Sequence, residues 1–155
     1  MARKTHTLGF TLIELLVTLA VLVILASIAA PNFARVIAEN RTTSAANEFL
    51  AMLQTARSEA VRLNRTVDVT QSGGNWHSGL NVVAPVNNTL RSMPAMAQGL
   101  TLTGPTPPLT FRPAGDTTAA NFQLTNTAGL TPAPTRCIRV ELTGTARVER
   151  GACQP

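Results

Sequence analysis

Hydrophobic residues are concentrated in one stretch near the start of the chain. Residues 10–30 carry a single charged side chain, Glu14, and are otherwise apolar or small and uncharged. As an α-helix these 21 residues rise about 1.5 Å each and extend roughly 30 Å, the thickness of a bilayer core. The pattern therefore predicts a membrane-spanning helix over residues 10–30.

The helical pattern continues past Pro31 into a second, amphipathic half over residues 31–64. Apolar positions recur there at spacings of three and four: Ala45, Phe49, Met52, Leu53, Ala56, Ala60 and Leu63. Because proline cannot donate the backbone hydrogen bond of a helix, Pro31 predicts a kink or an interruption between the halves. We expect the second half to pack against a globular domain.

Residues 65–155 are predicted to form a β-rich domain, because the hydrophobic period changes from that of a helix to two. Trp76 is expected to anchor its core. Residues 86–98 lack periodicity and are expected to form a loop. Short strands separated by Pro and Gly clusters are expected at residues 66–71, 76–83, 100–103, 109–112 and 121–125.

The last two strands are predicted to form a hairpin around a loop at residues 143–145. The expected register places Leu142 opposite Ala146, Val140 opposite Val148 and Ile138 opposite Arg150. The other face then pairs Glu141 with Arg147 and Arg139 with Glu149. Hydrophobic alternation and charge complementarity agree on this register.

A short basic segment precedes the apolar stretch, and two kinds of export signal fit it. Arg3 and Lys4 are expected to stay on the cytoplasmic side of the membrane. An ordinary signal peptide, cut near residues 27–29, would release a secreted soluble binding domain. Two features favour a retained helix. The helical pattern continues beyond Pro31, and Glu14, a charge costing about 2.5–3.5 kcal/mol at a bilayer centre, has no use in a signal peptide.

Residues 9–16, Gly-Phe-Thr-Leu-Ile-Glu-Leu-Leu, resemble the cleavage motif of type IV prepilins and type II secretion pseudopilins. The resemblance implies that residues 1–9 are a leader peptide. A prepilin peptidase would cut between Gly9 and Phe10 and methylate the new Phe10 amine. Pro31 also matches the family, in which a proline follows the hydrophobic segment.

The same resemblance implies the partners and the location of the protein. The partners would be other major and minor pilins or pseudopilins and an inner-membrane assembly platform. The chain would cross the bacterial inner membrane once, with its C-terminal domain in the periplasm.

The resemblance also gives Glu14 a physical role. A carboxylate within an apolar helix bundle needs a positive partner. The Phe10 ammonium of a neighbouring subunit would supply that charge and fix the axial stagger of the subunits. The alternative is a charge that extends to the cytoplasmic edge of the membrane.

Two further segments resemble a subgroup of this family. Residues 53–64, Leu-Gln-Thr-Ala-Arg-Ser-Glu-Ala-Val-Arg-Leu-Asn, resemble the helix end of the GspH/FimT/FimU group, except that Leu63 replaces a basic residue. Residues 111–115, Phe-Arg-Pro-Ala-Gly, resemble the strand and turn F-x-P-x-G of that group. The resemblance implies a pilin-like α+β fold and a minor subunit that initiates or caps a type IV pilus or a type II secretion pseudopilus.

The two cysteines, Cys137 and Cys153, are expected to form a disulfide. An even cysteine count beside a membrane-crossing segment is typical of an oxidising compartment. A loop of this length stabilises the fold by about 3 kcal/mol in the chain-entropy model. Two free thiols are the alternative.

Net charge leaves a nucleic-acid partner open. The chain has 13 Lys and Arg against 8 Asp and Glu, or +5, and without Arg3 and Lys4 it has 11 against 8, or +3. Scattered arginines are usually solvated surface. FimT-like members of the group, however, bind DNA during natural transformation through a C-terminal basic motif.

The region of this chain that matches the DNA-binding motif in part is residues 144–150, where Glu149 intrudes. The candidate DNA contacts are Arg136, Arg139, Arg147 and Arg150. The expected ion pairs of the hairpin would neutralise Arg139 and Arg147, leaving Arg136 and Arg150 as the freer charges.

Catalysis is not expected. His77 is the one histidine beyond the predicted leader, and it is expected to be a surface or turn residue. No phosphate loop, metal-ligand spacing or nucleophile elbow occurs in the sequence. We therefore expect neither a cofactor nor a bound metal.

Overall fold

The computed structural model describes residues 10–85 and 88–154. The chain divides into two compact units, one ending at Val36 and the other beginning at Ile37. Gly9, with the rest of the predicted leader, lies outside the described residues.

One helix, α1 (Leu12–Leu63), belongs to both units. Its start follows from the sequence, because the Thr11 hydroxyl accepts a hydrogen bond from the backbone N–H of Glu14 at 3.2 Å. Glu14 also places a negative charge in the first turn, which the helix dipole favours. The helix continues through residue 31, so of the two alternatives predicted at Pro31, a kink or an interruption, the interruption does not occur. Proline removes a single backbone hydrogen bond, which a long helix tolerates. A kink at Pro31 stays a prediction.

The first part of α1 is long and apolar enough to cross a membrane. Every residue from 10 to 30 is exposed in the single chain. A continuous apolar surface of this size is unfavourable in water. It therefore needs lipid or neighbouring helices around it.

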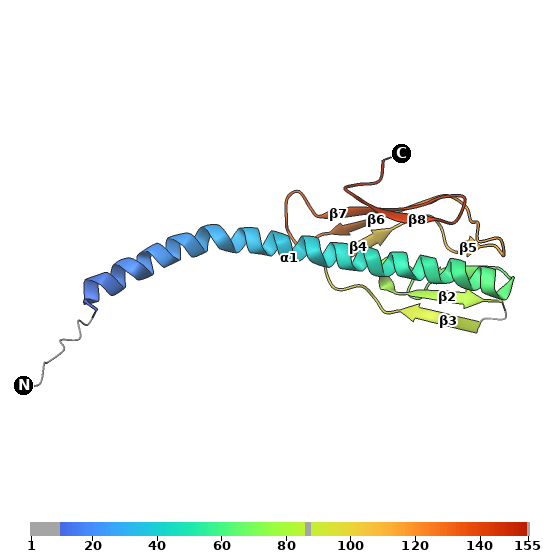
Figure 1. Cartoon of the computed structure of the whole chain (residues 1–155), viewed down its shortest axis with the longest axis horizontal. Helices are drawn as coiled ribbons and strands as arrows, with labels where there is room; N and C mark the ends of the chain where they lie inside the picture. The colour runs from blue at the N-terminus through green and yellow to red at the C-terminus, as the bar shows by residue number, and fades with distance from the viewer. Residues whose placement is uncertain (1–9, 86–87, 155) are drawn as a thin grey trace, which may run out of the picture. The chain divides into compact units, whose positions relative to one another are not determined.

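In the second unit, α1 and two antiparallel sheets share one hydrophobic core. The first sheet has the order β3-β2-β1-β5, and its strands are β1 (Val67–Gln71), β2 (Leu80–Ala84), β3 (Asn88–Met93) and β5 (Leu109–Phe111). The second sheet has the order β4-β6-β7-β8, and its strands are β4 (Leu100–Thr103), β6 (Ala120–Asn126), β7 (Thr135–Val140) and β8 (Ala146–Arg150). In Figure 1, β2 and β3 lie below the second half of α1, and β7 and β8 lie above it.

The centre of this core is a cluster of three aromatic rings. Phe49 of α1, Trp76 of the short 3₁₀ helix η1 (Trp76–Ser78) and Phe122 of β6 pack edge to face, with centroids 4.8–6.5 Å apart. The Trp76 indole N–H is satisfied, because it donates to the Pro105 carbonyl at 2.8 Å. The predicted core role of Trp76 is confirmed. The three rings join α1 to η1 and to β6.

Two strand predictions are wrong. Residues 76–78 form η1 rather than the start of a strand, because the Trp76 ring turns into the core and Gly79, at φ 113°, redirects the chain into β2. Residues 88–93 form β3 within the segment expected to be a loop. β3 is an edge strand whose side chains are mostly exposed, so its sequence shows no alternation of apolar and polar residues.

The predicted register of the C-terminal hairpin is also wrong, by two residues. Ile138 pairs with Val148 and Val140 with Ala146, so the loop covers residues 141–145. Backbone hydrogen bonds close this longer loop, from Glu141 N to the Thr145 carbonyl and from Gly144 N to the Glu141 carbonyl. Because the shift is even, every side chain keeps its predicted face.

Candidate functional site

The N-terminal end of α1 carries the residues predicted to direct processing and assembly. The Phe10 side chain is 85% exposed, and Glu14, one helical turn further on, is exposed as well. Glu14 forms no ion pair with another described residue. A cationic group of a neighbouring molecule could therefore reach its carboxylate.

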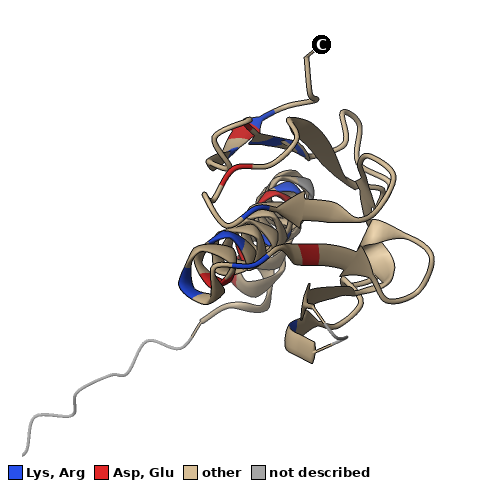
Figure 2. Cartoon of the chain, turned by 90° about the vertical axis from the view of Figure 1, so that its right-hand side faces the viewer, with Lys and Arg blue, Asp and Glu red and all other residues tan. Residues whose placement is uncertain are grey.

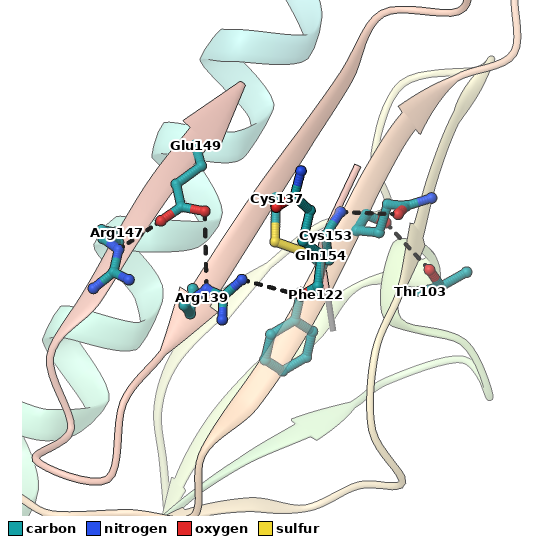
Figure 3. Close-up of a disulfide and its surroundings, with 9 residues drawn as sticks. Thr103, Phe122, Cys137, Arg139, Arg147, Glu149, Cys153 and Gln154 are labelled. Atoms are coloured by element: carbon teal, nitrogen blue, oxygen red, sulfur yellow. Dashed lines mark hydrogen bonds and ion pairs between the residues drawn. A yellow bond between two sulfur atoms is a disulfide. The ribbon is translucent and has the colours of Figure 1, made fainter. Parts of the chain in front are cut away.

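The C-terminal segment is fastened across the outer face of the second sheet by the Cys137–Cys153 disulfide, which is confirmed (Figure 3). The Cys153 backbone N–H donates to the Gln123 side-chain oxygen at 3.3 Å. Arg139 donates to the Gln154 carbonyl at 3.1 Å. The buried Cys137 thus ties a segment without regular structure to β7.

Replacing Cys137 or Cys153 with serine is expected to lower the free energy of unfolding by about 3 kcal/mol, because the unfolded chain regains the entropy that a 16-residue loop removes. Urea unfolding of the detergent-solubilised protein, with and without a reductant, measures this loss. The reductant should lower the wild-type midpoint and leave the midpoint of either variant unchanged. Equal midpoints for wild type and variants under oxidising conditions would contradict the prediction. Leader cleavage should be the same in all three proteins.

The four arginines considered for DNA binding are differently engaged. The predicted ion pairs Arg147–Glu141 and Arg139–Glu149 are both present, the latter at 3.8 Å, and they now join diagonal rather than opposite neighbours. A hydrogen bond from Arg147 Nε, at 2.7 Å, lowers the pKa of Glu149 below its ordinary value. The Arg147–Glu149 pair therefore stabilises the fold at neutral pH. Its effect is lost as the pH falls through the lowered pKa of Glu149. Solvent screening keeps the effect small.

Arg136 is less free than the sequence predicted. It donates to the Thr135 carbonyl at 2.9 Å and to the Thr43 hydroxyl of α1 at 3.0 Å. Arg150, which lies opposite Arg136 in the β7–β8 pair, is exposed. Figure 2 shows acidic and basic residues interspersed on α1 and on the C-terminal hairpin rather than separated into one basic face.

A contact that the sequence did not predict joins three distant segments at the end of the domain where α1 ends. Arg57 Nε donates to the Gly115 carbonyl at 3.0 Å. Gly144, in the hairpin loop, packs directly on the same carbonyl group. Arg57 belongs to the helix-end motif and Gly115 to the F-x-P-x-G motif. The sequence therefore singled out both segments, but it did not indicate that the two segments are in contact.

Gly144→Ala is expected to lower the free energy of unfolding by about 2–5 kcal/mol. Gly144 has φ 74°, and a Cβ there would lie 1.9 Å from the Gly115 oxygen. Gly129→Ala is the matched control, since Gly129 has φ 77° and open space around it, and should lose only about 1–2 kcal/mol. Thermal unfolding of both variants measures the difference. Equal losses would show that the contact with Gly115 is unimportant.

The described residues contain no group of three or more His, Cys, Asp or Glu that could hold a metal ion. His77 lies on η1 and is half-buried, with its Nδ1 atom shielded from solvent and lacking a hydrogen-bond partner in the described part of the chain.

Comparison with known proteins agrees with this arrangement. A family model described as a prokaryotic N-terminal methylation motif matches residues 5–30. The motif and the helix-plus-sheet fold define the class as pilin-like subunits. A second family model, described as type II transport protein GspH, matches residues 45–144, and the chain belongs to this family. Membership implies a membrane-anchored subunit that a peptidase processes and that assembles with other pilins.

Solved structures confirm the pilin-like α+β fold. The type IV minor pilin FimU of Pseudomonas aeruginosa is similar, with a TM-score of 0.65 and 30% sequence identity, over 74% of this chain and 94% of that chain. The minor pseudopilin EpsH of Vibrio cholerae has a TM-score of 0.57 and 15% identity, over 71% of this chain and 97% of that chain, and shows the fold alone. No curated protein sequence matches the chain.

Proposed function

We propose that the protein is a minor subunit that initiates or caps a type IV pilus, assembling through the first part of α1. The observation that carries this proposal is the exposed apolar surface of residues 10–30 with one carboxylate, Glu14, near its start. A prepilin peptidase cuts between Gly9 and Phe10 and methylates the Phe10 amine. The match to the methylation motif supports this processing over release by an ordinary signal peptide.

Before assembly the mature chain waits in the bacterial inner membrane, which it crosses once. Arg3 and Lys4 favour a cytoplasmic N-terminus, and the Cys137–Cys153 disulfide favours an oxidising periplasm around the domain. The inner-membrane assembly platform then transfers the subunit into the fibre. In the fibre, Glu14 pairs with the Phe10 ammonium of a neighbouring subunit, which sets the axial stagger.

A type II secretion pseudopilus is the second candidate, favoured by the GspH family model over residues 45–144. The type IV pilus is placed first because the similarity to FimU reaches 30% identity, against 15% to EpsH. DNA uptake receives less support, since Arg139 and Arg147 are paired with carboxylates and Arg136 is hydrogen-bonded to α1.

Deletion of the gene separates the two candidates. Under the pilus proposal, the deletion strain has fewer surface pili at an unchanged cellular level of the major subunit, and it secretes normally. Loss of protein secretion with normal piliation would transfer the assignment to the pseudopilus. A strain with normal pili and normal secretion would contradict both.

A further inference from the structure

Arg57 is a cation without a carboxylate partner in the part of the chain that the structure describes. Among the described residues, the one hydrogen bond of its side chain joins Nε to the Gly115 carbonyl at 3.0 Å, and the side chain is half-buried. Four other arginines of the second unit have carboxylate partners: Arg62 with Glu59, Arg112 with Asp116, Arg139 with Glu149, and Arg147 with Glu141 and Glu149. The bond to Gly115 holds the guanidinium in place and leaves its Nη1 and Nη2 donors unused among the described residues.

Arg57 lines a groove of about 510 Å³ beside the hairpin loop. The groove is lined by Gln54, Arg57, Ser58, Val61, Arg62, Gly144, Thr145 and Ala146, and thus by no acidic side chain. Gly144, Ser58 and Ala146 are small, which keeps the space beside the guanidinium open. Val61 is 54% exposed and gives the groove an apolar wall.

We propose that this groove binds an acidic side chain of a neighbouring pilin-class subunit, with the Arg57 fork holding its carboxylate. The inference rests on the proposed assembly function and adds the site and the chemistry of one contact. The planar guanidinium fork matches a carboxylate with two parallel hydrogen bonds. The exposed Gln54 amide and the Val61 side chain then contact the rest of the incoming segment.

Charge and shape favour a protein carboxylate over a nucleic acid. Binding along a phosphate backbone needs several available cations in a row. The groove offers Arg57 alone, because Arg62 is paired with Glu59 at 2.5 Å. A single held guanidinium beside an apolar wall fits one side chain better than a strand of phosphates.

The test uses the full-length protein in its native strain, with a photoreactive benzophenone amino acid in place of Gln54. Illumination of intact cells is expected to crosslink the protein to a pilin-class subunit, and the crosslinked peptide should contain Asp or Glu. Arg57→Glu should reduce the crosslink by about tenfold or more, because like charges then meet in the groove. Arg65→Glu is the matched control, since Arg65 is an exposed arginine outside the groove and carries the same change in charge.

A charge swap distinguishes loss of the carboxylate contact from loss of folding in the Arg57→Glu protein. Changing the acidic residue of the crosslinked peptide to arginine should restore the crosslink of the Arg57→Glu protein. The inference is overturned if the protein enters sheared fibres but gives no crosslink, gives one that Arg57→Glu leaves unchanged, or crosslinks to DNA. Absence of the protein from fibres would instead contradict the proposed function itself.

Discussion

Glu14→Gln should exclude the protein from the fibre while leaving membrane insertion and leader cleavage intact. Glutamine keeps the shape of the side chain and removes its charge. Under the proposed pairing, the Phe10 ammonium of the neighbouring subunit would then be buried without a partner. Breaking a buried ion pair in this way costs about 3–5 kcal/mol. The amount of protein in sheared fibres, measured against the amount in membranes, should fall by about tenfold or more.

Glu14 also has a local role at the start of α1, which must be separated from its proposed role in fibre assembly. Its backbone N–H donates to the Thr11 hydroxyl, and its charge lies in the first turn of α1. Thr11→Ala removes this cap and keeps the carboxylate, so it should cost the helix about 1 kcal/mol and allow assembly. Loss of assembly in Thr11→Ala with normal assembly in Glu14→Gln would show that the cap, not the charge, is required.

Phe122→Ala should produce the largest loss of stability in the β-rich domain, about 3–5 kcal/mol. The Phe122 ring is fully buried and packs against both Phe49 and Trp76, so truncation leaves a cavity at the centre of the core. The backbone of Gly104 lies against the same ring, which limits how far the site can close. Urea unfolding followed by Trp76 fluorescence measures the effect directly.

Leu142→Ala serves as its control. Leu142 is of similar character but 66% exposed in the hairpin loop, and its truncation should change the free energy of unfolding by less than about 0.5 kcal/mol. Comparable losses in Phe122→Ala and Leu142→Ala would show that the aromatic cluster does not dominate the stability of the core.

The sequence predicted those parts of the fold that depend on local patterns. The 3.6-residue period over residues 31–64 placed Phe49, Met52 and Ala56 in the core, where they are buried. Alternation placed the ends of β1, β4 and β6 to within one residue. β3 was missed because it is a sheet edge, paired through a bulge between Val82 and Val83, and its polar exposed residues carry no periodic signal.

The hairpin shows why local agreement can give a wrong register. Two registers that differ by two residues place every side chain on the same face, so alternation cannot separate them. The ion pairs do not separate them either, because long arginine side chains reach diagonal neighbours. The loop at residues 141–145 also has a contact outside the hairpin, the hydrogen bond from Thr117 N to the Leu142 carbonyl, which the pattern of the hairpin alone does not indicate.

The candidate sites also divide into those that local sequence patterns predicted and one that depends on the folded chain. Gly9, Phe10 and Glu14 were assigned from one contiguous motif, and the cysteine pair from an even cysteine count beside a membrane-crossing segment. The groove at Arg57 could not be predicted, since it depends on Gly115 and Gly144 meeting a helix residue that is 58 positions from the nearer of them. Only the folded chain brings these three segments together.

The intact mass of the mature protein, purified from its native membrane, decides whether the chain keeps residues 10–30 after processing. We expect a chain that begins at a methylated Phe10 and is lighter by two hydrogen atoms because Cys137 and Cys153 form a disulfide. A chain that begins near residue 30 would instead identify a secreted soluble domain, and assembly through α1 would have to be abandoned.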